Sequence, residues 1–249
     1  ELEKRREAII ASVKEQEKLT PELEKQLLSA ASMSELEDLY LPYKPKRRTR
    51  ASIAREKGLE PLAKIIMSQQ ETDPLRRAKQ FLNPAKDVTT EEEALAGARD
   101  IIAEWINESQ QSRQRMRSHF ERSGEIYARP VRGKELEGIK YETYYDWAEP
   151  LMKAPSHRLL AMFRGENEGF LKVSIEPEEQ QAIESLNRIF VRSSNESSRL
   201  VEEAVKDAYK RLLQPSIETE YRQMAKEKAD AEAIRVFAEN LRQLLMMPP

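Results

Sequence analysis

Apolar residues recur at helical spacing along this chain, and helix-capping signals mark where the helices begin. The clearest signal is Thr90-Glu91-Glu92-Glu93, in which the Thr hydroxyl and the third Glu can each accept a backbone N–H at a helix start. Apolar positions follow every three or four residues, at Leu95, Ala98, Ile101, Ile102, Trp105 and Ile106. This pattern predicts a helix here and favours a fold in which helices each bury one face.

Start and stop signals of the same kind divide the rest of the N-terminal half. Thr20-Pro21 and Asp73-Pro74 each place a capping side chain before a proline at the first helical position. Ser32-Met33-Ser34-Glu35 has the spacing of a capping box. Thr49 can cap a helix over residues 51–57, and Gly58 follows its end. We expect Gly58 in the left-handed backbone conformation that often ends helices.

The composition also favours helices. Charged residues make up 35% of the chain and aromatic residues 6%, and there are only seven glycines. Such a composition is typical of helices with long solvated faces. Residues 170–175 alternate between apolar and polar side chains and predict one strand, whereas residues 125–140 show no clear period and predict a loop or a weak hairpin. The expected fold class is therefore mainly α, a multi-helix assembly with at most one small β element.

The C-terminal half predicts further helices. A short one is expected from Ser156 to Arg164, ending at Gly165. From residue 178 the helical period continues largely without the earlier glycine and proline breaks, and we expect helices at 178–191, 198–213, 216–228 and 230–246. The polar run Ser193-Ser194-Asn195 suggests a boundary between a first region, 1–193, and a helical segment, 194–249.

The sequence has no cysteine and no long apolar stretch, and these absences argue against several classes of protein. There is no cysteine, so no disulfide, thiolate metal site or cysteine nucleophile can form, which fits a cytoplasmic location. No apolar stretch approaches the ~18 residues of a membrane span. The chain starts with Glu-Leu-Glu-Lys-Arg-Arg and reads as a helix already under way, so we expect both ends to be cut from a longer protein.

A dense basic run is the first candidate site. Lys44, Lys46, Arg47, Arg48 and Arg50 lie within seven residues, in a loop that Pro42 and Pro45 stiffen. The net charge is −2, so attraction to nucleic acid must come from local patches of this kind. The run predicts phosphate contacts, and the neighbouring Tyr40 and Tyr43 are candidates for base stacking. The alternative is a solvated loop, or arginines paired internally with acidic helices such as 91–93.

A second basic cluster lies on a predicted helix and contains Arg113, Arg115, Arg117 and Arg122. Arg113 and Arg117 are four residues apart, so they share a helix face and repel each other unless an anion lies between them. This spacing makes both residues candidates for phosphate contact. The alternative is an ordinary exposed helix face.

Catalytic constellations are missing from the sequence. The only histidines, His119 and His157, have no histidine partner at metal-ligand spacing. Glu142, Asp146 and Glu149 lie near His157 in sequence, but no nucleophile motif accompanies them. We expect no enzyme activity, no metal site and no cofactor.

Three segments resemble the Tex family of bacterial transcription accessory proteins. The first is Leu39-Tyr40-Leu41-Pro42-Tyr43-Lys44-Pro45-Lys46-Arg47-Arg48 with its continuation to Leu62, the second runs from Tyr145 through Pro155-Ser156-His157-Arg158 to Gly169, and the third is the tail from Asn240. The resemblance spans the whole chain.

The resemblance implies packed helices that include a helix-turn-helix-like part, and a protein that binds RNA or DNA and influences transcription. In the family, an RNase-H-like domain, helix-hairpin-helix repeats and an S1 domain follow this region and carry most of the nucleic-acid binding. The leading hypothesis is therefore a non-catalytic, nucleic-acid-associated scaffold that positions those domains. The alternative is a protein-interaction module that docks RNA polymerase or another transcription factor through a helical face.

Overall fold

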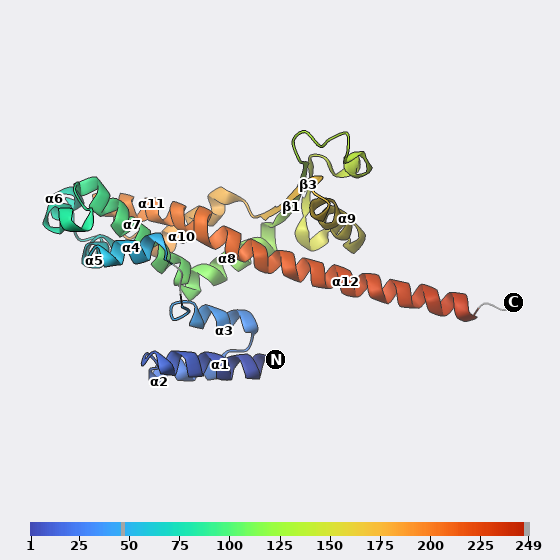
Figure 1. The fold of residues 1–249 in the computed structure, drawn as a ribbon, viewed down its shortest axis with the longest axis horizontal. Coiled ribbons are helices and arrows are strands. Elements are labelled where there is room, and N and C mark those ends of the chain that lie inside the picture. Colours follow the sequence, from blue (N-terminus) through green and yellow to red (C-terminus); the bar gives the residue numbers. More distant parts are fainter. Residues whose placement is uncertain (46–47, 247–249) are drawn as a thin grey trace. The chain divides into compact units, whose positions relative to one another are not determined.

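The computed structural model describes residues 1–45 and 48–246, which form two compact units (Figure 1). Unit 1 combines residues 1–115 with 183–213, and unit 2 combines residues 116–182 with the chain from residue 214 onward. The boundary expected near residue 193 falls inside the second segment of unit 1. The compact units are therefore divided differently from the regions 1–193 and 194–249.

The described part of unit 1 is helical. It contains α1 (Leu2–Glu15), α2 (Pro21–Ser29), α3 (Met33–Tyr40), α4 (Arg50–Glu56), α5 (Glu60–Ser68), α6 (Pro74–Ala78), α7 (Glu91–Glu108) and α11 (Glu196–Ala208), with 3-10 turns at Lys79–Phe81 and Pro84–Lys86 and a π-helical turn at Tyr209–Leu213. Two further helices, α8 (Gln110–Ser123) and α10 (Glu179–Phe190), each contain residues of both units.

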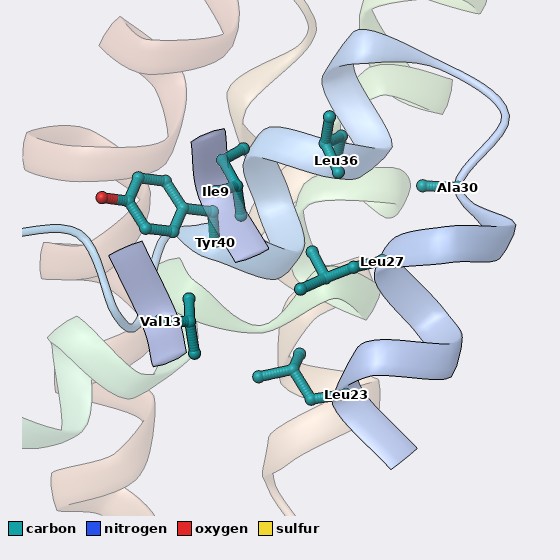
Figure 2. Close-up of a cluster of buried hydrophobic side chains, with 7 residues drawn as sticks. All are labelled: Ile9, Val13, Leu23, Leu27, Ala30, Leu36 and Tyr40. Atoms are coloured by element: carbon teal, nitrogen blue, oxygen red, sulfur yellow. The ribbon is translucent and has the colours of Figure 1, made fainter. Parts of the chain in front are cut away.

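The first three helices enclose a small core of their own (Figure 2), made of Ile9, Val13, Leu23, Leu27, Ala30, Leu36 and Tyr40. Arg6 is buried beside this core. Its Nε donates to the carbonyl of Leu27 at 2.9 Å and its Nη2 to that of Ala30 at 2.8 Å. These bonds satisfy carbonyl groups that the end of α2 leaves without a helical partner, and a cation is favourable at that end of a helix dipole.

Helix α7 forms the second core of unit 1, where α4, α5, α6 and α11 pack against it. The predicted apolar positions of α7 are buried, among them Ala98, Ile101 and Ile102. The predicted capping box is also confirmed, because Thr90 and Glu93 exchange side-chain-to-backbone bonds. Hydrogen bonds from Thr89, first from its backbone N–H, lower the pKa of the Glu93 carboxyl, as expected for a carboxylate at a helix start.

The two sequence segments of unit 1 are joined through Gln69, a buried residue in left-handed backbone with φ +56° at the end of α5. Its side-chain Nε2 donates to the Phe190 carbonyl at 2.7 Å, and its Oε1 accepts the Arg192 N–H at 2.8 Å. Its own carbonyl accepts from Asn195 Nδ2 at 2.8 Å. One side chain thus satisfies backbone groups more than a hundred residues away in sequence.

Gly58 ends α4 with φ +83°, which confirms the left-handed conformation expected from the sequence. A Cβ at this position would meet only Lys86 Nζ, at 4.0 Å, so a substitution strains the backbone without a steric clash. We therefore expect Gly58→Ala to lower the free energy of unfolding by about 1 kcal/mol in chemical denaturation. Gly58→Asn should lower it less, because Asn tolerates left-handed backbone better than Ala. Equal losses for both variants would contradict this explanation.

Unit 2 contains a three-stranded antiparallel sheet with the strand order β2-β1-β3, formed by β1 (Glu125–Pro130), β2 (Trp147–Pro150) and β3 (Leu171–Glu176). The strand predicted at residues 170–175 is confirmed as β3. The prediction of a loop or weak hairpin at residues 125–140 is wrong at its start, where β1 is the middle strand. This strand is short and ends in Pro130, so the sequence pattern alone was too brief to reveal it. The rest of the interval leads to 3-10 turns at Ile139–Tyr144 and Leu151–Lys153.

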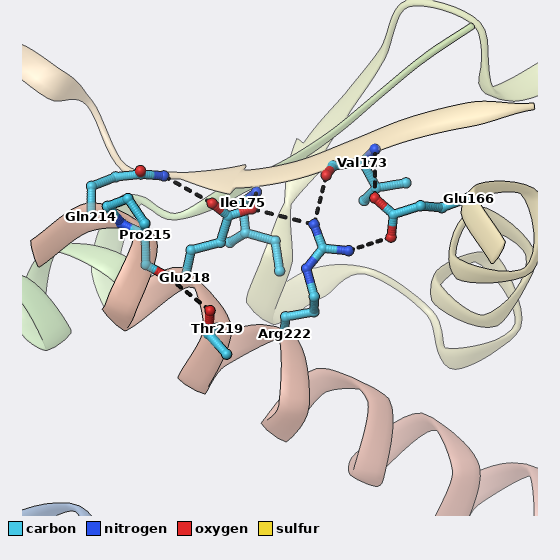
Figure 3. Close-up of polar contacts among 8 residues, drawn as sticks. All are labelled: Glu166, Val173, Ile175, Gln214, Pro215, Glu218, Thr219 and Arg222. Atoms are coloured by element: carbon cyan, nitrogen blue, oxygen red, sulfur yellow. Dashed lines mark hydrogen bonds and ion pairs between the residues drawn. The ribbon is translucent and has the colours of Figure 1, made fainter. Parts of the chain in front are cut away.

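Side chains from two helices occupy the free edge of β3 (Figure 3). Glu218 of α12 (Gln214–Met246) accepts the Ile175 N–H at 3.0 Å, and Glu166 of α9 (Ser156–Asn167) accepts the Val173 N–H at 3.2 Å. Arg222 donates to the Val173 carbonyl at 2.6 Å and pairs with Glu166. These contacts satisfy the Val173 N–H, the Val173 carbonyl and the Ile175 N–H, which would otherwise be open to another strand.

Several helix boundaries differ from those expected; for example, α11 ends at Ala208 and a π-helical turn continues to Leu213. Helix α9 does not end at Gly165 but continues to Asn167, with Gly169 at φ +77° shortly after it. Gly165 instead permits close packing, since a Cβ there would lie 2.7 Å from Leu171 Cδ1. The helices expected at 216–228 and 230–246 are one continuous helix, α12, because no glycine or proline separates them.

Candidate nucleic-acid interface

The basic run connects α3 to α4 in unit 1. After Tyr40, the N–H groups of Tyr43 and Lys44 both donate to the Tyr40 carbonyl, at 2.8 and 3.0 Å, so the chain leaves α3 through a tight turn. The loop ends at Thr49, which caps α4 by accepting the Ser52 N–H at 3.0 Å. Of the predicted site residues, Lys46 and Arg47 lie outside the described residues.

A buried carboxylate anchors the end of this loop. Thr49 Oγ1 donates to Glu104 Oε1 at 3.2 Å, and Arg55 pairs with Glu104 Oε2 at 2.5 Å. The Glu104 side chain is only 9% exposed. Glu104 was not among the sequence-based site residues, although its place inside the apolar run Ile101-Ile102-Ala103-Glu104-Trp105-Ile106 was a signal of burial. Glu104 therefore holds Thr49, the end of the loop, on α7.

The described cations of the loop are exposed. Lys44 and Arg50 both lie at the surface. Arg48 is 73% exposed and pairs with Glu56, itself 62% exposed, at 3.6 Å. Its partner is therefore on α4 and not in the acidic helix start at 91–93. Exposed pairs of this length contribute about 0–1 kcal/mol, so a phosphate can compete for Arg48 with little penalty.

Beneath the loop lies a cavity of about 220 Å³, lined by Lys44 and Arg211 but also by the acidic residues Asp100, Glu104 and Glu108. Burial raises the pKa of the Asp100 carboxyl above its ordinary value, and Arg211 opposes that rise. An acidic floor repels anions. The geometry therefore limits any phosphate contact to the exposed rim of the loop and does not provide an enclosed phosphate pocket.

The aromatic neighbours of the loop face the core. Tyr40 is buried in the cluster of Figure 2, its hydroxyl lies 3.0 Å from Ser12 Oγ, and the Arg5 guanidinium covers its ring at 5.7 Å. Tyr43 is partly buried against the same cluster. The burial of Tyr40 excludes it as a stacking platform for a base, contrary to the sequence-based hypothesis.

Arg113 and Arg117 are engaged by carboxylates. Arg113 Nε lies 2.5 Å from Asp38 Oδ1, with the two side chains 6% and 2% exposed. Arg117 contacts both carboxylate oxygens of Glu220, at 2.8 and 3.2 Å. Internal anions thus relieve the repulsion expected at this spacing. The structure favours a structural role for both residues, and phosphate contact by them stays a prediction.

The polar residues considered for catalysis are not gathered into a site. His157 is exposed in the first turn of α9. Glu149 pairs with Arg158 at 3.0 Å, whereas Glu142 and Asp146 are exposed. Within residues 1–45 and 48–246, no group of three or more His, Asp or Glu side chains could hold a metal ion. No helix among those residues is long and apolar enough to cross a membrane.

Similarity to known proteins identifies the family of this chain. The family model described as Tex central region-like matches residues 69–237, well over half of the chain. The chain belongs to the Tex family. Among the relatives of this Tex segment are Protein tex of Bordetella pertussis, 40% identical over 97% of the segment, and the Transcriptional accessory protein Tex of Neisseria gonorrhoeae, 38% identical over all of it. The uncharacterized protein YdcI of Bacillus subtilis is 42% identical over the whole segment.

The Tex segment spans about a third of the length of these relatives, with shares of 35%, 32% and 33%. The family match covers most of unit 2, including the sheet, and in unit 1 the residues from 69 onward, including α7. The basic loop lies before the matched residues but inside the region that the relatives share.

Proposed function

We propose that this Tex segment is a non-catalytic, nucleic-acid-associated scaffold that positions downstream RNA- or DNA-binding domains and adds its own contact through the loop at residues 44–50. The observation that carries the proposal is the anchored loop, whose cations Lys44, Arg48 and Arg50 are exposed. Thr49, at the end of the loop, is already held by Glu104, so this part of the chain loses little conformational entropy when phosphates bind. A relative named as a transcriptional accessory protein supports the connection to nucleic acid.

The proposal needs no cofactor and assigns no reaction to the segment. Its partner is RNA or DNA, with the transcription machinery as the wider setting. The helix-turn-helix-like part and the cytoplasmic location stay predictions from the sequence.

The test removes the loop charges. We expect Lys46, Arg47, Arg48 and Arg50 changed together to Ala to weaken binding of unrelated nucleic-acid sequences about equally, by tenfold or more at low salt. The slope of log affinity against log salt should fall by as much as about 0.7 for each lost contact to a single strand. Equal loss across sequences is expected because phosphate contacts carry no base information. Fluorescence anisotropy between about 50 and 200 mM salt measures both effects.

A matched control changes Lys4, Lys14, Lys18 and Lys25 to Ala. These lysines are exposed on or between α1 and α2, so this variant has the same net charge as the loop variant. Its binding should change far less. Unchanged binding by the loop variant would contradict the proposal. So would loss of folded structure in that variant, which would assign the arginines to internal pairing.

A second candidate function has one specific observation in its favour. In α12 the residues after Ala229 are exposed, and Ile234, Phe237, Leu241 and Leu244 recur at helical spacing on one side of it. In unit 2 a cavity of about 440 Å³ is lined by Leu160, Val236 and Phe237. An apolar helix face of this kind is suited to a protein partner such as a component of the transcription machinery. Binding to such a partner would depend less on salt than phosphate binding does, which separates the two functions.

A further inference from the structure

The outward face of the sheet in unit 2 has charges at both ends and a tyrosine between them. In the register of β1 with β3, the outward pairs are Glu125 with Glu176, Tyr127 with Ser174, and Arg129 with Lys172. The alternate positions, such as Ile126 and Val173, are buried. The face is therefore acidic at one end, aromatic in the middle and basic at the other end.

The basic end is built from two strands and a turn. Side chains directly opposite in an antiparallel pair lie about 5 Å apart, and like charges there destabilise the sheet. Arg129 and Lys172 form such a pair. Beyond them the Lys134 N–H donates to the Val131 carbonyl at 2.9 Å across a turn that has Gly133 at φ +83°. The turn adds Arg132 and Lys134, so four cations surround the end of the sheet.

These four cations have no ion-pair partner among residues 1–45 and 48–246. All four are exposed, and none forms an ion pair with another described residue. Several other described arginines do form ion pairs, as Arg48, Arg113 and Arg117 illustrate. Glu168 forms an ion pair with Lys140, with Nζ 2.5 Å from Oε2. The loop after Lys134 also contains Glu135 and Glu137, both exposed.

Tyr127 supplies an aromatic surface next to these charges. Its ring is partly exposed, and its hydroxyl donates to Glu125 Oε2 at 2.6 Å. That hydrogen bond, together with burial, raises the pKa of Tyr127 to about 12, so the phenol is neutral near pH 7. The bond also fixes the ring on the sheet. An immobilised ring loses little rotamer entropy when a base stacks on it.

We propose that this face binds single-stranded nucleic acid, with one base stacked on Tyr127 and the adjacent phosphates at Arg129, Lys172 and the turn cations Arg132 and Lys134. The inference rests on the proposed function and adds a second contact to it, in the other unit. A stacked base must be unpaired, which selects single strands over duplexes. The acidic end repels phosphate, so the nucleic-acid backbone is confined to the basic end.

The test uses the full chain and short labelled homopolymers of deoxythymidine and uridine. We expect Arg129→Gln with Lys172→Gln to weaken binding about tenfold at about 50 mM salt. The salt slope should fall by about 1.4, which is about 0.7 for each single-strand phosphate contact. Lys226→Gln with Arg242→Gln removes two exposed cations from α12 and is the control with the same net charge. The control should bind almost as tightly as the unchanged chain.

Variants of Tyr127 separate stacking from charge. Tyr127→Leu should weaken single-strand binding about tenfold with little change in salt slope, and Tyr127→Phe should bind like the unchanged chain because the ring is kept. Circular dichroism confirms that each variant is folded. Duplex binding should respond little to Tyr127→Leu. If Tyr127→Leu weakened duplex binding as much as single-strand binding, the proposal that a base stacks on Tyr127 would be wrong.

The outcomes distinguish this inference from the proposed function. Unchanged binding in the Arg129/Lys172 variant, with weakened binding in the variant of residues 46–50, overturns the sheet contact and supports the loop. The reverse result supports the sheet contact and overturns the loop. Failure of the unchanged chain to bind any single strand overturns both. Tighter binding of an acidic peptide than of the homopolymers overturns the assignment of the sheet face to nucleic acid.

Discussion

Arg113→Met should lower the free energy of unfolding by about 3–5 kcal/mol, the usual effect of removing one partner from a buried ion pair. Arg113 and Asp38 are 6% and 2% exposed, and Nε lies 2.5 Å from Oδ1. Without the guanidinium, the buried Asp38 carboxylate loses the cation that lies 2.5 Å from its Oδ1. The penalty comes mainly from keeping a buried carboxylate whose cation has been removed, because the pair itself gains little over a well-packed apolar contact.

The double variant Arg113→Met with Asp38→Leu should regain much of this loss, since it removes both charges of the buried pair. Arg115→Met is the control on the same helix, because Arg115 is exposed, and its effect should stay within about 0.5 kcal/mol. Urea denaturation followed by circular dichroism measures all three. If Arg113→Met kept the stability of the unchanged chain but lost nucleic-acid binding, the phosphate role predicted from the sequence would be correct and the structural role wrong.

Arg222→Met should lower the free energy of unfolding of unit 2 by about 2–3 kcal/mol. The substitution removes the donor to the Val173 carbonyl and the partner of Glu166 (Figure 3). The Arg222 side chain is 29% exposed, so water screens part of the loss, and the expected value is lower than for Arg113. The guanidinium also lies 5.6 Å from the ring centroid of Phe163, a contact that the variant loses.

Hydrogen exchange gives a local readout for this variant. The Ile175 N–H donates to Glu218, and Arg222 contacts the same carboxylate at 3.3 Å and helps to orient it. In Arg222→Met this N–H should therefore exchange faster than in the unchanged chain. Arg235→Met is the control on α12. Arg235 and its partner Glu239 are 65% and 60% exposed, so this ion pair should contribute less than about 0.5 kcal/mol. Unchanged exchange at Ile175 in Arg222→Met would show that the edge of β3 is held without this arginine.

Local signals in the sequence predicted most helix starts. The predicted N-cap side chains do accept a backbone N–H at the start of their helix, at Thr20, Thr49, Asp73 and Thr90. They were predictable because a cap depends only on residues within one turn. Gly58 was predictable for the same reason. Gly165 was misread, because a glycine that permits close packing and a glycine that ends a helix look alike until the neighbouring strand is known.

Contacts between distant residues were beyond sequence reasoning. Asp38 and Arg113 are 75 residues apart, so the basic cluster at 113–122 gave no indication of its buried partner. Arg129 and Lys172 meet only through the pairing of β1 with β3, and the alternation in residues 170–175 was the only sign that Lys172 points outward. The basic loop was found from sequence because its charges are consecutive.

The interrupted sequence of unit 1 has a consequence for its synthesis on the ribosome. Gln69 and α7 receive their partners, Asn195 and α11, only when residues 183–213 have been made, roughly a hundred residues after Arg115. At about 5–20 residues per second this interval lasts about 5–20 s. Throughout it, the side of α7 that α11 covers in the finished protein is an uncovered apolar surface on the nascent chain. We expect that surface to be where a chaperone acts on this protein during translation.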